Sequence, residues 1–236
     1  MTLKQSQRFS EDELRAISDG FEDKHPQEIV EWAFDTFGVS NVVVGSSFGG
    51  ASGAVLVDVA AKIAPYANVF YLDTDFLFPE TYALVDETKR RYGIEPIGVK
   101  SIHTPEEQAE RVGPELWKTD PDACCNLRKV EPNVRMLANM DAWVTGIRRD
   151  QSGREDVPIV AWDSKFWLVK VNPVAHWTKK DVWGYILKND VPYNKLLDQG
   201  YKSIGCTHCT RSVAANEDER AGRWSGQGKT ECGLHT

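Results

Sequence analysis

The sequence predicts an α/β protein with a mostly parallel sheet and helices on both faces. Short apolar runs such as NVVVGSS, NVFYLD and FWLVKVNP alternate with helical stretches, which is the pattern of a parallel sheet. The chain has 236 residues, of which 41% are hydrophobic, enough for one full-size domain with a short appendage. We therefore expect one α/β domain over residues 1–210 and a mobile, cysteine-bearing segment over residues 211–236.

Two helices are expected before the first strand. Ser10 and Glu13 form a capping-box pattern ahead of ELRAI. In PQEIVEWAFDTFG the spacing of Ile29, Ala33 and Phe37 places their side chains on one helical face. Both stretches therefore predict helices that bury one side.

The alternation of strands and helices follows. The strand NVVVGSS leads to the helix ASGAVLVDVAAKI, and the strand NVFYLD leads to the helix PETYALVDETKRRYG, with Pro79 in its first turn and Gly93 at its C-cap. The runs IEPIGVK, AWVTGI and FWLVKVNP extend the sheet, and Thr178 with Asp181 caps the helix KKDVWGYILKN. Ligands of such sheets bind beyond the carboxyl ends of the strands.

Charge and polarity exclude broad classes of partner. The formal net charge of -7 disfavours bulk binding to nucleic acid or to an anionic membrane. No window approaches the roughly 20 apolar residues that span a bilayer, and the N-terminal MTLKQSQRFS is polar. We expect a cytoplasmic protein without nucleic-acid or membrane partners, whose anionic substrate is small; a homo-oligomer remains open.

The segment VVVGSSFGGASG predicts an oxyanion-binding loop. A strand leads into it and a helix follows, and its glycines let backbone N–H groups close on an anion at the helix N-terminus. The candidate residues are Ser46, Ser47, Gly49, Gly50 and Gly53. A plain tight turn explains them equally well, and their spacing matches neither a Walker loop nor a dinucleotide fingerprint.

The five cysteines form two pairs and one single residue. Cys124 and Cys125 are adjacent in CCNLRK, and Cys206 and Cys209 form a Cys-x-x-Cys motif in GCTHC. In a reducing compartment such pairs indicate metal ligands or redox catalysis rather than disulfides. Adjacent cysteines reach one tetrahedral zinc ion awkwardly, so an iron–sulfur cluster is favoured over zinc. The remaining alternative is two buried free thiols plus a redox Cys-x-x-Cys motif.

The fifth cysteine, Cys232, lies in GKTECGLHT behind the polar run RWSGQGK. Such a segment offers little for a side chain to pack against, so we expect an exposed thiol that is either accidental or reactive. Of the five histidines only His235 sits where it would assist this thiol or a charged ligand, and His208 is expected to be a spacer between metal ligands.

Basic residues recur beside the cysteines, the Ser/Gly loop and the strand end VTGIRR. Single surface arginines are mostly solvated and carry no function. The repeated placement instead predicts an anion pocket, and the residues concerned are Arg128, Lys129, Arg148, Arg149, Arg154, Arg220 and Arg223.

The segments CCNLRKVEP, VTGIRRDQSGR, NPVAHWT, VPYNKLLDQGYKSIGCTHCT, EDERAGRW and ECGLH resemble the assimilatory adenosine 5′-phosphosulfate reductases, over most of the chain from Ser46 to His235. The resemblance implies an adenine-nucleotide alpha hydrolase-like fold and one 4Fe-4S cluster, held by Cys124, Cys125, Cys206 and Cys209. It also implies that Cys232 attacks the sulfur of adenosine 5′-phosphosulfate, that AMP leaves, and that thioredoxin or a similar dithiol donor releases sulfite from the Cys-S-sulfonate.

The same resemblance implies a set of substrate-binding residues in the Ser/Gly loop, among the cations and at the C-terminus. They are Ser46, Ser47, Gly49, Lys129, Gly146, Arg154, Arg220, Arg223 and His235. The chain departs from the family at Ser52 and Gly53, where relatives commonly carry acidic residues, and at Asp75 and Phe76, where a glycine and a basic residue are usual.

Three other functions compete with this interpretation. Reduction of 3′-phosphoadenylyl sulfate, alone or beside adenylyl sulfate, uses the same chemistry, but enzymes restricted to it typically lack the two cysteine pairs. An ATP pyrophosphatase that adenylylates its substrate needs an acid in the loop to help hold magnesium, and SSFGGASG has none. A metal-binding regulatory module needs neither the Cys232 thiol nor a nucleotide-type loop.

Overall fold

The computed structural model describes residues 8–151, 153–214, 216–226, 228, 229 and 231–235. Its two N-terminal helices, α1 (Glu11–Asp19) and α2 (Pro26–Phe37), lie where the sequence predicts them. The capping box of Ser10 is present, and Ile29, Ala33 and Phe37 are buried on one face of α2. Local polar contacts and apolar spacing therefore account for both helices.

The centre of the molecule is a six-stranded sheet with the strand order β3-β2-β1-β4-β6-β5. All pairings are parallel except the last, in which β5 runs antiparallel to β6 at the edge. The strands are β1 (Val42–Gly45), β2 (Asn68–Asp73), β3 (Ile97–Lys100), β4 (Ala142–Val144), β5 (Val160–Asp163) and β6 (Leu168–Val171). Because β1 lies between β2 and β4, the strand order reverses at β1, and its carboxyl end is the expected ligand position.

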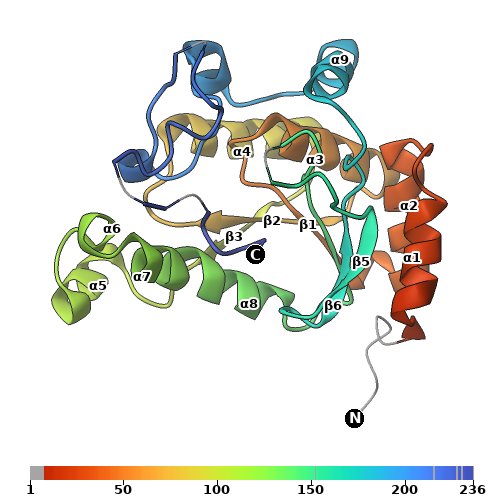
Figure 1. The fold of residues 1–236 in the computed structure, drawn as a ribbon, viewed down its shortest axis with the longest axis horizontal. Helices are drawn as coiled ribbons and strands as arrows, with labels where there is room; N and C mark the ends of the chain where they lie inside the picture. Colours follow the sequence, from red (N-terminus) through yellow and green to blue (C-terminus); the bar gives the residue numbers. More distant parts are fainter. Residues whose placement is uncertain (1–7, 152, 215, 227, 230, 236) are drawn as a thin grey trace.

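Helices cover both faces of the sheet, as the sequence predicts (Figure 1). Val42 and Val44 of β1 enter the larger core with α2 and α3, whereas Val43 enters a smaller core with Leu137 of α8 on the opposite face. This alternation is the period of a strand buried on both sides. The remaining helices are α3 (Ala51–Ile63), α4 (Pro79–Tyr92), α5 (Pro105–Val112), α6 (Leu116–Thr119), α7 (Pro121–Cys125), α8 (Glu131–Leu137) and α9 (Lys179–Asn189).

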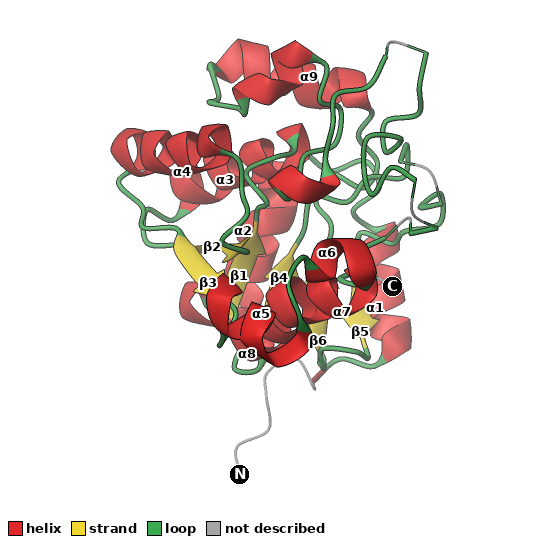
Figure 2. Cartoon of the chain, turned by 90° about the vertical axis from the view of Figure 1, so that its left-hand side faces the viewer, coloured by secondary structure: helices red, strands yellow, loops and turns green. Residues whose placement is uncertain are grey.

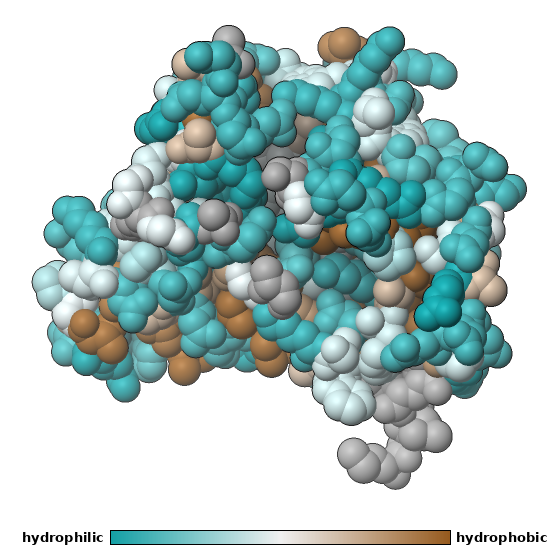
Figure 3. Space-filling model, viewed as in Figure 1, coloured by the Kyte–Doolittle hydropathy of each residue, from teal (hydrophilic) through white to brown (hydrophobic). Residues whose placement is uncertain are grey.

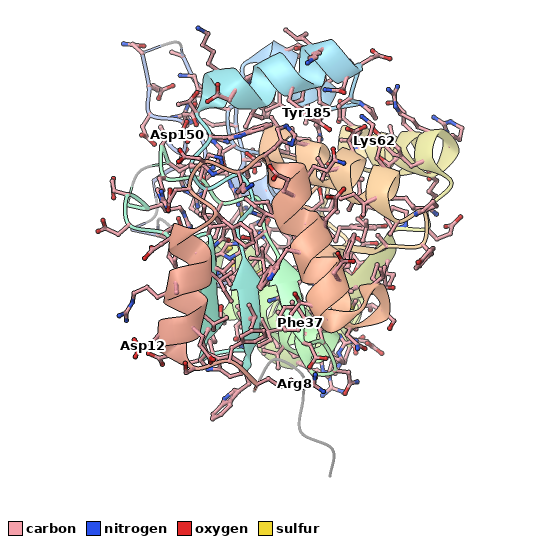
Figure 4. All side chains as sticks on the ribbon, turned by 90° about the vertical axis from the view of Figure 1, so that its right-hand side faces the viewer. Arg8, Asp12, Phe37, Lys62, Asp150 and Tyr185 are labelled. Carbon is pink, nitrogen blue, oxygen red and sulfur yellow. The ribbon has the colours of Figure 1, made fainter. Side chains whose placement is uncertain are left out.

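A buried carboxylate joins three helices of the larger layer. Asp58 of α3 is fully buried and accepts hydrogen bonds from Tyr92 of α4 at 2.9 Å, Tyr185 of α9 at 2.7 Å and Lys62 at 2.7 Å. Figure 4 labels Lys62 and Tyr185, which approach each other between α3 and α9, with the ammonium 5.7 Å from the ring centroid. A buried charge satisfied by three donors fixes α9 against the domain.

The chain after α9 consists mainly of loops with short helical turns (Figure 2). The sequence did not predict α5, α6 or the antiparallel edge strand β5. The face shown in Figure 3 is mostly hydrophilic, with hydrophobic side chains along its lower edge near α5 and α8. Within the described residues, no helix combines the length and apolarity needed to cross a membrane.

Candidate active site

The Ser/Gly loop begins at the carboxyl end of β1. Ser46 and Ser47 each accept a hydrogen bond from the backbone N–H two residues further on, at 3.2 Å, and these contacts fold the loop into consecutive tight turns. A Cβ atom on Gly49 would lie 2.9 Å from Ile204, and one on Gly53 would lie 2.8 Å from the Ser46 hydroxyl. The glycines are therefore required by close packing between the loop and its neighbours.

Gly146 follows β4, the neighbour of β1, and faces this loop. A Cβ atom on Gly146 would lie 3.1 Å from the Cβ of Ser52. The Ser52 hydroxyl accepts a 2.5 Å hydrogen bond from Arg148, whose Nε also donates to Asp150 at 2.8 Å. Ser52 thus holds the buried side chain of Arg148.

The four paired cysteines line one cavity. Cys124 and Cys125 end α7, Cys206 is the N-cap of a short turn, η5 (Thr207–Cys209), and Cys209 is the last residue of that turn. A π-helical turn, η3 (Asn126–Val130), connects α7 to α8 and carries Arg128 and Lys129 into the same cavity lining. Such π-turns recur at functional sites because they rotate the side chains that follow.

Three thiols in this cavity, those of Cys124, Cys125 and Cys209, have a raised pKa. Burial raises the pKa of Cys124 to about 12, with further contributions from the neighbouring thiols, and burial raises the pKa of Cys209 to about 11. Buried thiols of this kind lose their protons when they bind a metal. Among the described His, Cys, Asp and Glu side chains, no three are close enough together to ligate one metal ion.

Aromatic side chains cover the cysteine cavity. His208 stacks on Trp117 with ring centroids 4.0 Å apart, and Phe76 contacts both rings edge-on. Asp75 has a φ of 60°, a left-handed conformation that favours glycine and that aspartate tolerates better than most residues.

Four cations lie around the ring of another aromatic residue, Trp224. Its buried ring lies 4.4 Å from the guanidinium of Arg223 and between 5.5 and 5.9 Å from the charged groups of Lys129, Arg220 and Lys229. Among the described residues, carboxylates pair with Arg220 and Lys229 but none pairs with Lys129 or Arg223. Lys129 and Arg223, which lack a carboxylate partner among the described residues, make this cluster a candidate anion site.

Cys232 lies beside these cations. Burial acts to lower the pKa of Lys129, but interaction with the thiolate forms of Cys206, Cys232 and Cys125 outweighs it, and the pKa is raised overall. Burial lowers the pKa of Arg223, and Cys232 is among the groups that oppose this effect. Cys232 is half-buried rather than exposed as the polar sequence suggested, because the described residues around it pack against the domain.

His235 anchors the end of this segment. Its ring stacks on Trp143 of β4, with centroids 5.0 Å apart and planes 18° apart. Burial lowers the pKa of His235 well below its usual range, and the nearby charges of Lys170, Arg154 and Lys165 lower it further. The imidazole is therefore neutral at physiological pH.

Not every cation named from the sequence lies in the anion site. Arg149 forms a two-pronged ion pair with Glu22 at 2.7 Å, on the turn between α1 and α2. Arg128 is buried and donates to Gln108 at 2.8 Å and to Asp75 at 3.0 Å. Both arginines hold loops in place, whereas the sequence grouped them with the anion pocket.

Residues 41–212 match the phosphoadenosine phosphosulfate reductase domain. The chain belongs to this family. A protein of Salinibacter ruber named adenosine 5′-phosphosulfate reductase is 46% identical over 230 residues, which cover 97% of this chain and 90% of the relative. The protein of the same name from Halalkalibacterium halodurans is 46% identical over 224 residues, 94% of this chain and 96% of the relative.

Two solved structures are similar to this chain in fold. The phosphate complex of phosphoadenylyl-sulfate reductase from Candida auris has a TM-score of 0.75 and 32% identity, covering 87% of this chain and 98% of its own. FMN adenylyltransferase from Candida glabrata, with FMN and an ATP analogue, has a TM-score of 0.57 at 17% identity, covering 92% and 75%. The latter likeness confirms the fold expected for the family.

Proposed function

We propose that the protein reduces adenosine 5′-phosphosulfate to sulfite and AMP, with thioredoxin or a similar dithiol as the electron donor. The observation that carries this proposal is a half-buried thiol, Cys232, that follows Glu231. Glu231 pairs with Arg220, one of the four cations around Trp224, and the charges of Lys129 and Arg223 interact with Cys232. The names of relatives that are 46% identical over nearly the whole chain support the same substrate.

In the first step the Cys232 thiolate attacks the sulfate sulfur of the substrate. A sulfur–sulfur bond forms, the bond from sulfur to the bridging oxygen breaks, and AMP leaves with that electron pair. Lys129 and Arg223 offset the repulsion between the thiolate and the anionic substrate and stabilise charge on the departing phosphate. The Ser/Gly loop follows β1, where the strand order reverses, and the nucleotide is expected at this carboxyl end of the sheet.

In the second step a donor thiolate attacks the Cys232 sulfur and expels sulfite. The second thiol of the donor then resolves the mixed disulfide, so the donor is oxidised and Cys232 returns as a thiol. Direct access is needed for this exchange, so the half-buried Cys232 is expected to move away from the domain. Because a dithiol donor stays reduced in a reducing compartment, we expect the reaction to occur in the cytoplasm.

The residues present fit a 4Fe-4S cluster. Cys124, Cys125, Cys206 and Cys209 approach one cavity from two segments, and Arg128 and Lys129 in its lining would balance the negative charge of a thiolate-bound cluster. Two of the four cysteines are adjacent in sequence, an arrangement that suits separate iron atoms better than one tetrahedral zinc ion. When bound, the cluster would fix the cavity and add a local charge, and the two electrons of the reaction come from thiols.

Phosphoadenylyl sulfate is the second candidate substrate, because the structurally similar Candida auris protein is named for it. The experiment is a side-by-side assay of sulfite release from both nucleotides with reduced thioredoxin. We expect adenylyl sulfate to give the higher kcat/KM, and a preference for the 3′-phosphorylated nucleotide would overturn the assignment. Iron and sulfide analysis of protein purified without oxygen tests the cluster independently.

A further inference from the structure

Glu231, immediately before Cys232, bridges two arginines. One carboxylate oxygen accepts from Arg154 at 3.2 Å and the other accepts from Arg220 at 3.2 Å. Arg154 belongs to the loop after β4, so this pair connects the C-terminal segment to the sheet. The backbone on the N-terminal side of the thiol is therefore fixed by a shared carboxylate.

The backbone after Cys232 is held by a different contact. Lys165, in the turn between β5 and β6, donates from its ammonium to the carbonyl oxygen of Gly233 at 2.5 Å. Asp163 shapes that turn by accepting from the N–H groups of Lys165 and Phe166, both at 3.1 Å. Gly233 has a φ of 81°, which a residue with a side chain rarely adopts.

We infer that Glu231 and Lys165 are positioning residues that hold Cys232 from its two sides. An in-line attack on sulfur requires the thiolate to be aligned with the departing oxygen, and fixing the chain on both sides of the nucleophile removes the entropic cost of that alignment. This inference rests on the proposed function.

The same contacts are weak enough to be broken in each catalytic cycle. The side chain of Glu231 is 30% exposed, and those of Arg154 and Arg220 are 15% and 36% exposed. All three side chains keep some contact with solvent, so water can replace these ion pairs when a donor protein displaces the segment to reach the sulfonate. A guanidinium carries several N–H donors, so Arg154 can hold Glu231 and still face an anion.

The test uses the full-length protein and the variants Glu231→Gln and Lys165→Met. Lys165→Arg keeps a charged donor at the turn. The matched control is Glu219→Gln: Glu219 lies in the same C-terminal segment as Glu231, but it pairs with Lys179 of α9. Three quantities are measured: the rate at which iodoacetamide alkylates Cys232, read by mass spectrometry of its peptide; the Kd for AMP; and single-turnover sulfonation by adenylyl sulfate without thioredoxin.

We expect Glu231→Gln and Lys165→Met to speed alkylation of Cys232 and to slow sulfonation by about tenfold or more, while the Kd for AMP changes by less than about twofold. Lys165→Arg should recover most of the sulfonation rate, and Glu219→Gln should match the wild type. Wild-type alkylation and sulfonation in both variants would overturn the inference. A loss of AMP affinity in Glu231→Gln that equals the loss of sulfonation rate would also overturn it, because Glu231 would then act on the nucleotide. If the wild type forms no sulfonate, the proposed function fails, and the alkylation rates still decide the positioning role.

Discussion

Replacement of Gly205 by alanine should displace Arg223 without altering any charge. A Cβ atom on Gly205 would lie 2.4 Å from Nη2 and 2.6 Å from Cζ of Arg223, where ordinary contact begins at 3.4 Å. The guanidinium must therefore move by about 1 Å, a displacement that typically costs about 100-fold in a catalytic site. We predict this loss in kcat/KM, equivalent to about 2.7 kcal/mol.

The assay is sulfite release from adenylyl sulfate by Gly205→Ala, Arg223→Ala and the double variant. All three nearest atoms belong to Arg223, so alanine at Gly205 should have almost no further effect once the guanidinium is gone. Gly184→Ala is the control, because a Cβ there meets nothing within 4 Å. Equal losses from Gly205→Ala in both backgrounds would refute the reasoning, as would full activity of the single variant.

Three further predictions concern stability, pH and the cysteine cavity. Asp58→Ala should lower the free energy of unfolding by about 2 kcal/mol, because three donors lose their acceptor, and an unchanged urea midpoint would contradict this. The folded-state pKa of His235 is lowered, so docking of the C-terminal segment should be complete above about pH 6.5 and weaken as pH falls below it. The rate of Cys232 alkylation in the wild type, divided by the rate in His235→Asn at the same pH, should therefore rise toward one between about pH 7 and pH 5. A ratio of the two rates that stays constant would refute this. Cys206→Ser should lose iron and activity together, and full iron and sulfide content would remove Cys206 from the ligands.

Local sequence signals predicted the fold well. Caps such as Ser10 and Thr178 act within four residues of themselves, and the valines of β1 report burial on both faces. The edge strand β5 was missed because its stability comes from pairing with β6. Its sequence, VAWD, carries no such information.

The sequence predicted which types of residue form the candidate site, but not which individual residues lie together in it. The sequence could not separate Arg149 from the anion site, because its partner Glu22 is 127 residues away. Trp224 was missed altogether, although it lies directly beside Arg223 in EDERAGRW. Its role depends on cations from several segments meeting over one ring, which only the folded chain reveals.

The central claim is that Cys232 is the nucleophile, and its covalent intermediate tests this most directly. Protein incubated with adenylyl sulfate and no thioredoxin should gain the mass of one SO3 group on the peptide that contains Cys232, and reduced thioredoxin should remove it as sulfite. Cys232→Ser should keep its iron and bind AMP yet form no adduct, since a hydroxyl is protonated at neutral pH. An adduct on another cysteine, or sulfite release at the wild-type rate by Cys232→Ser, would contradict the account.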